Sequence, residues 1–188
     1  MNEKSLNVFI DLGSSKIRLG AYSQETKKNI FISERECISN FGLKNFDIKN
    51  SNEVIRDLIK SAEKDVDKHI KNINLMIDTP DMFSIDISIK KISDNNKHSK
   101  NDISSLLNEA KSLIQKNYFD KKIIHTIVKK FIFDDEEFFK IPDKEISYSS
   151  LIIELKFICF SDYIWKNLEE SFNNNYLKID NIYCSSYI

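Results

Sequence analysis

The order in which two hydrophobic periodicities follow each other along the chain constrains its fold more than any other feature. Near residue 54 the apolar residues begin to recur at intervals of three or four, which predicts an amphipathic helix up to about residue 70. The run that follows this helix ends at Asp78-Thr79-Pro80, where proline interrupts regular structure. Short apolar runs that predict strands occupy residues 6–11, 16–23, 29–36 and 73–77.

The pattern changes at Met82. From residue 83 to residue 90, isoleucines and one phenylalanine alternate with polar residues, as in a strand with one exposed face. We expect a helix at 101–116, strands at 123–133 and 147–160 around an acidic turn at 134–146, then a helix from Asp162 and a strand at 178–184. The sequence therefore predicts a mixed α/β (α+β) chain in two lobes, with residues 82–160 inserted into a unit made of 1–81 and 161–188.

Composition excludes several classes of protein. The 188 residues are 41% hydrophobic and 30% charged, too apolar for a disordered chain. Lys and Arg number 28 against 29 Asp and Glu, which disfavours nucleic acid as a partner. No run approaches the roughly 20 apolar residues of a membrane span, and the N-terminus does not resemble a signal peptide. We expect a cytoplasmic protein without a membrane anchor of its own.

Metal and acid–base chemistry find little support in the sequence. Four consecutive acids at 134–137 indicate a solvated turn rather than a catalytic cluster, and His125 lacks a nucleophilic partner nearby in the sequence. The aromatic pairs at 118–119 and 138–139 favour core packing, with an exposed contact patch as the alternative. The remaining candidate metal ligands are too scattered to form a site: Cys37, Cys159, Cys184, His69 and His98.

One local motif carries chemistry, Asp11-Leu12-Gly13-Ser14-Ser15-Lys16 between the first two strands. Glycine and small polar residues at a hairpin tip favour outward backbone N–H groups, which can bind a phosphate. Lys16 could reach that phosphate, and Asp11 could hold Mg²⁺ through water. The alternative is that the turn needs these residues for its geometry alone. Candidate nucleotide-binding residues are therefore Asp11, Gly13, Ser14, Ser15 and Lys16.

The motif and the order of elements resemble the bacterial cell-division protein FtsA of the actin-like ATPase superfamily. That family begins with a hydrophobic residue, Asp or Glu, Ile, Gly, Ser or Thr, any residue and Lys, as does Ile10–Lys16 here. It inserts a strand–helix–strand–strand domain, called 1C, into subdomain 1A. Within the insert, residues 123–134 match the family pattern of apolar residues around His125, and Ser185-Ser186 lies where FtsA has Leu-Ala-Ser-Ser.

The resemblance implies a partial actin-like (ribonuclease H-like) fold, with 1A at 1–81 and 161–188 and 1C at 82–160. It implies a cytoplasmic assembly or adaptor module of the division ring, at the inner face of the membrane through its partners. These partners are other division proteins and further copies bound through 1C. The family's second lobe, its FtsZ-binding surface and its membrane-targeting helix are not matched, so we expect weak ATP/Mg binding and no catalysis. Alternatives are an actin-like ATPase or filament subunit that needs a second lobe, and a PilM-like pilus-assembly protein.

We also expect an apolar sheet surface on the 1A side that favours self-association. The edge strand 178–184 is blunted only by Lys178 and Asp180. The side chains assigned to the exposed face are those of Val8, Ile10, Leu19, Ala21, Ile179 and Tyr183.

Overall fold

The computed structural model describes residues 6–13, 15–36, 51–92, 100–142 and 147–187. The predicted site residue Ser14 and two candidate metal ligands, Cys37 and His98, lie outside these ranges. The chain divides into two compact units, one of residues 1–82 and 162–188 and one of residues 83–161. Each is described by itself.

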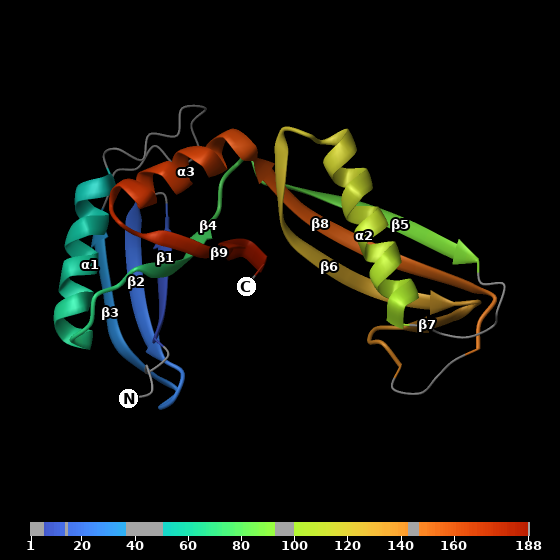
Figure 1. The fold of residues 1–188 in the computed structure, drawn as a ribbon, viewed down its shortest axis with the longest axis horizontal. Coiled ribbons are helices and arrows are strands. Elements are labelled where there is room, and N and C mark those ends of the chain that lie inside the picture. The colour runs from blue at the N-terminus through green and yellow to red at the C-terminus, as the bar shows by residue number, and fades with distance from the viewer. Residues whose placement is uncertain (1–5, 14, 37–50, 93–99, 143–146, 188) are drawn as a thin grey trace. The chain divides into compact units, whose positions relative to one another are not determined.

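The first unit is built on a sheet that pairs segments far apart in the sequence (Figure 1). Its strands are β1 (Leu6–Leu12), β2 (Lys16–Ser23), β3 (Lys28–Glu36), β4 (Asn72–Ile77) and β9 (Lys178–Cys184). Their order is β3-β2-β1-β4-β9. β1 and β2 form the predicted hairpin, whereas β4 lies parallel to both β1 and β9. β4 and β9 pair directly although the second unit lies between them in the sequence. The second unit is therefore an insertion in the chain that leaves this sheet continuous.

Two helices cover one face of this sheet, α1 (Asn52–Val66) and α3 (Asp162–Asn174). They lie in one layer, because the Ser171 hydroxyl of α3 donates to the Asn52 side chain of α1 at 2.7 Å. The apolar stripe of each helix is buried, as its periodicity predicts. The buried stripe residues are Ile55, Leu58, Ile59 and Ala62 on α1 and Ile164, Leu168 and Phe172 on α3.

The face assignment for the sheet was wrong at its centre. Val8, Ile10, Leu19 and Ala21 are each at most 2% exposed, so they belong to the core and not to an exposed surface. Strand alternation shows which residues share a face but not which face the helices cover. The opposite face holds a shallow hollow of about 360 Å³, whose apolar lining includes Phe9, Tyr22, Ile32 and Met76. β9 does form an edge of the sheet, as predicted.

The second unit is a sheet of order β5-β8-β6-β7 with one helix. Its elements are β5 (Phe83–Ile92), α2 (Lys100–Asn117), β6 (Lys121–Phe133), β7 (Glu136–Phe138) and β8 (Ser150–Ser161). The segment predicted as an acidic turn contains β7, because Glu136 and Phe138 pair with the end of β6. Phe119 is 87% exposed and Phe139 is 77% exposed, so the favoured prediction of core packing was wrong at these two positions.

The core of the second unit lies between α2 and the odd-numbered residues of β8, which are almost fully buried. Tyr148 precedes β8 and closes this core: its ring packs edge-on against Phe133 with a centroid separation of 5.2 Å. Its hydroxyl donates to Asp102 Oδ2 at 3.0 Å, and Lys91 pairs with the other oxygen of Asp102 at 2.5 Å. Burial and the Asp102 carboxylate together raise the pKa of Tyr148 to about 12.

This pKa shift makes the stability of the second unit sensitive to alkaline pH. The unfolded chain releases the phenol proton near pH 10, whereas the folded chain keeps it up to about pH 12. The stabilising contribution is therefore complete below pH 10 and is lost as the pH rises through 12. We expect Tyr148→Phe to lower the free energy of unfolding by about 1 kcal/mol at neutral pH and to flatten its decline above pH 10.

Urea denaturation at pH 7, 10 and 11 measures this effect, with Tyr163→Phe as the control at an exposed tyrosine. A Tyr148→Phe profile as steep as that of the unaltered chain would contradict the assignment.

Candidate functional site

The tip of the β1–β2 hairpin is closed by hydrogen bonding within the turn. The Gly13 N–H donates to the Lys16 carbonyl oxygen at 3.0 Å. A Cβ atom at Gly13 would lie 2.9 Å from that oxygen, which real Cβ atoms do not tolerate, so the position requires glycine. This N–H group is therefore turned into the hairpin. Its predicted use in binding a phosphate competes with the turn itself.

Asp11 and Lys16, the charged residues of the motif, both have ionic partners in the same sheet. Asp11 lies opposite Arg18 in the hairpin register, and its Oδ2 accepts from Arg18 Nη1 at 3.1 Å. Lys16 donates to Glu34 Oε1 of β3 at 2.5 Å. Arg18 Nε also donates to Glu34 Oε2 at 3.2 Å, so the four side chains form one alternating chain of charges.

The electrostatics of these groups follow from this arrangement. The hydrogen bonds to Asp11 and Glu34 raise the pKa of Arg18 above its usual value. The ammonium group of Lys16 holds the pKa of Glu34 below its ordinary range. All four side chains keep some exposure to solvent, so the network is screened by salt. It nevertheless occupies the cation and the carboxylate that a Mg²⁺–phosphate group would need.

The C-terminal ends of three parallel strands bring further polar residues to the end of the sheet that carries the β1–β2 turn. β1, β4 and β9 end beside one another, with Asp11 near the end of β1, Asp78 directly after β4 and Ser185 directly after β9. Ser185 donates to Asp11 Oδ1 at 3.3 Å, and the Ser186 hydroxyl bonds to Asp78 Oδ2. In α/β sheets, ligands commonly bind at the C-terminal ends of the strands. The sequence did not predict the contribution of Asp78, although two parallel strands ending in acids would have indicated it.

One buried polar atom near the C-terminal end of β4, the hydroxyl oxygen of Thr79, has no hydrogen-bond partner among the described residues. The Thr79 side chain is only 6% exposed, and its hydroxyl oxygen makes no hydrogen bond there. Ser15 is exposed in the turn, and Ser14 lies outside the described residues. The structure thus brings Asp11, Gly13 and Lys16 together with Arg18, Glu34 and Asp78. The role of these residues toward ATP and Mg²⁺ stays a prediction.

Two other candidate residues, Cys159 and His125, lie on strands of the second unit. Cys159 lies in the core of the second unit, where burial raises the pKa of its thiol to about 11, which disfavours the reactive thiolate. Burial also lowers the pKa of His125 below its usual value. Across the described ranges no three His, Cys, Asp or Glu side chains gather as a metal site would require. None of the helices in those ranges is both long and apolar enough to span a membrane.

Comparisons with known proteins identify the fold. The chain is similar over its full length to 49% of a chain in a PilM–PilN type IV pilus biogenesis complex, with 9% identity and a TM-score of 0.64. A second similar structure is the cytoplasmic domain of EpsL, an inner-membrane component of the Vibrio cholerae type II secretion system. The match includes 96% of this chain and 57% of the EpsL chain, with 10% identity and a TM-score of 0.48. A third similar structure is a Bacteroides thetaiotaomicron protein with an actin-like ATPase fold. The match includes 97% of this chain and 53% of that protein, with 14% identity and a TM-score of 0.34.

No protein-family model matches the chain, and no curated protein sequence does. The chain spans about half the length of the pilus protein chain that it resembles. The fold prediction is confirmed at the level of a mixed α/β chain with two sheets, whose fold is similar to that of the pilus protein chain. These similarities do not distinguish FtsA from other proteins of that fold.

Freeing Lys16 from Glu34 tests whether the hairpin can bind phosphate at all. We expect Glu34→Gln to increase Mg-ATP affinity by no more than about fivefold, because exposed ion pairs contribute little. NMR titration at high nucleotide concentration measures the change, and Glu25→Gln at the opposite end of the hairpin is the control with the same change in charge. Unchanged or weaker binding in Glu34→Gln would show that Lys16 does not contact the nucleotide.

Proposed function

We propose that this chain is a protein-binding assembly module with the actin-like fold and that it does not hydrolyse nucleotide. The observation that carries the proposal is the charge network of the hairpin. Asp11 is bonded to Arg18 and Ser185, and Lys16 is bonded to Glu34. Phosphoryl transfer depends on charged groups that are free to bind phosphate and metal. Here those groups stabilise the sheet instead.

Within this class we propose a cytoplasmic role in the division ring, reached through partner proteins at the inner face of the membrane. The resemblance of Ile10–Lys16 and residues 123–134 to FtsA supports this role. The contacts that the resemblance implies are further copies and other division proteins, bound through residues 82–160. Two exposed aromatic side chains of that unit, Phe119 and Phe139, are the kind of residue that protein interfaces use.

A second candidate is a role in pilus assembly. The specific observation in its favour is the full-length structural similarity to a chain of the PilM–PilN complex. That complex joins two proteins, so this candidate is also a protein-binding module. The two roles differ in the machine that the module serves rather than in what the hairpin does.

Calorimetry tests the non-catalytic part of the proposal. We expect Mg-ATP to bind the isolated protein no tighter than about millimolar, equivalent to roughly 4 kcal/mol. Phosphate release should stay at the level of a protein-free blank. The physical reason is that the Gly13 N–H is already bonded within the turn and that binding must also break the Lys16–Glu34 and Asp11–Arg18 pairs, although each of these exposed pairs contributes little. Micromolar affinity or measurable turnover would overturn the proposal.

A deletion of the gene in its own organism separates the two machines. The division role predicts cells that grow and replicate but form filaments, because the septum fails to assemble. The pilus role predicts normal division with loss of surface pili. Complementation with the double variant Phe119→Ser and Phe139→Ser should fail to restore the phenotype if these aromatic residues contact the partner. Complementation with Tyr163→Ser, at an exposed aromatic residue of the first unit, serves as the control.

A further inference from the structure

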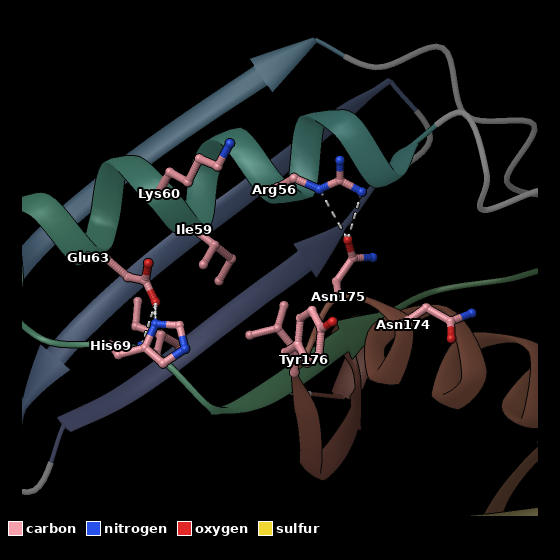
Figure 2. Close-up of a pocket in the computed structure, with 10 residues that line it drawn as sticks. Arg56, Ile59, Lys60, Glu63, His69, Asn174, Asn175 and Tyr176 are labelled. Atoms are coloured by element: carbon pink, nitrogen blue, oxygen red, sulfur yellow. Dashed lines mark hydrogen bonds and ion pairs between the residues drawn. The ribbon is translucent and has the colours of Figure 1, made fainter.

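A hollow of about 280 Å³ lies in the first unit, at the end of the sheet away from the hairpin (Figure 2). α1 forms one wall, and the turn between α3 and β9 forms the other. Its floor is apolar, because Ile59, Ile70 and Leu177 line it and are each no more than 7% exposed. Arg56 faces Asn175 at one end, and Glu63 faces His69 at the other.

The rim of this hollow carries an excess of positive charge. Arg56 and Lys60 project from α1, and His69 is 65% exposed beside them. The one acid of the lining, Glu63, already accepts from the Ile70 N–H at 2.8 Å and pairs with His69. Lys60 has no ion pair in the part of the chain that the structure describes. Lys60 is therefore available to an external carboxylate, and Arg56 bonds to the neutral amide of Asn175, unlike the ion-paired cations of the hairpin.

A second hollow of about 420 Å³ adjoins the first and extends the same surface. The two share His69, Tyr176 and Leu177, and the second adds Lys71 and Lys178. Lys71 and Lys178 belong to segments held together by the hydrogen bond from the Lys178 N–H to the Lys71 carbonyl, at 2.8 Å. The result is an elongated groove with an apolar floor and cations spaced along it.

Tyr176 occupies this groove in a backbone conformation that its side chain disfavours. Its φ is 61°, in the left-handed region, and its side chain is 87% exposed. The turn ends α3 with a hydrogen bond from the Leu177 N–H to the Phe172 carbonyl at 3.0 Å, an arrangement in which glycine is usual. A residue with strained backbone and an exposed ring contributes little to folding, which points to a role in binding.

The shape and charge of the groove select its ligand. A pocket of this volume is at the small end for drug-sized molecules, so it fits a side chain better than a nucleotide. α3 ends here and the carbonyl oxygens of Phe172 and Asn173 accept hydrogen bonds from the turn itself, so α3 offers no N-terminal N–H groups that would favour a compact phosphate. Cations spaced along a groove pair instead with carboxylates spaced along a peptide.

We propose that this groove binds an acidic peptide segment of a partner protein, with one apolar side chain of the peptide packed on Ile59 and Leu177. Lys60 and Arg56 pair with its carboxylates, and the Tyr176 ring covers the inserted side chain. The inference deepens the proposed function, since it names the chemistry of one partner. Its residues belong to the first unit and differ from those of the hairpin, whereas Phe119 and Phe139 belong to the second unit.

Fluorescence anisotropy with the full chain tests the inference. The probe is a fluorescein-labelled peptide of alternating aspartate and leucine, compared with an aspartate–serine peptide and a lysine–leucine peptide. We expect the aspartate–leucine peptide alone to bind, with a dissociation constant of about 100 μM or below at low salt, and to weaken as salt is added. Lys60→Glu and Tyr176→Gly should each weaken binding at least about tenfold.

Two controls separate binding from folding and from bulk charge. Tyr176→Gly relieves the positive φ, so its thermal midpoint should equal or exceed that of the unaltered protein while peptide affinity falls. Lys111→Glu, on the exposed surface of α2, changes the net charge as Lys60→Glu does and should leave affinity unchanged. Amide resonances of residues 56–63 and 174–177 should shift on binding.

Several outcomes would overturn the inference. Equal binding of the aspartate–serine peptide, or equal loss in Lys111→Glu, would show bulk electrostatics rather than a groove. Preferential binding to phosphatidylglycerol vesicles would show a lipid surface instead, and no binding of the aspartate–leucine peptide would refute the site. None of these measurements uses ATP, and the second unit enters only through the Lys111→Glu control, so the proposed function can stand or fall independently.

Discussion

The parallel pairing of β4 with β1 on one side and β9 on the other is the interaction on which the rest of the structure depends. In the sheet, Leu75 of β4 lies between Ile10 of β1 and Ile182 of β9. The whole second unit separates β4 from β9 in the sequence. Such non-local pairing requires long-range loop closure, which buried apolar side chains on the strands must offset. Once formed, it fixes two opposite ends of the sheet, one at Asp11 and the other at Lys71.

The sequence predicted the elements well because each is set by local periodicity. The alternation in residues 83–90 and the three- to four-residue stripe of α1 are visible without any tertiary information. The hairpin was predictable for the same reason. Its register was not, because strands that end at residue 11 and begin at residue 16 would pair Asp11 with Lys16, whereas the observed register pairs Asp11 with Arg18.

Features that depend on tertiary packing could not be read in the same way. Alternation in β1 groups Val8 with Ile10 but does not say that α1 and α3 cover that face. The approach of Asp78 to Ser186, and of Arg56 to Asn175, requires knowing which strands and helices become neighbours. Tyr176 is a subtler case, because its position looks like an ordinary helix end until the left-handed φ is seen.

The two ends of the sheet differ in how their charges are used, and that difference bears on where a partner binds. At the hairpin end, Lys16 and Arg18 are satisfied by acids of the same sheet, so an incoming anion must displace an existing partner. At the other end, Lys60 lies above a buried apolar floor with Tyr176 exposed beside it. A ligand there gains charge pairing and apolar burial without breaking an internal ion pair of Lys60. An acidic partner is therefore expected to bind more strongly at the end of the sheet that carries no recognisable sequence motif.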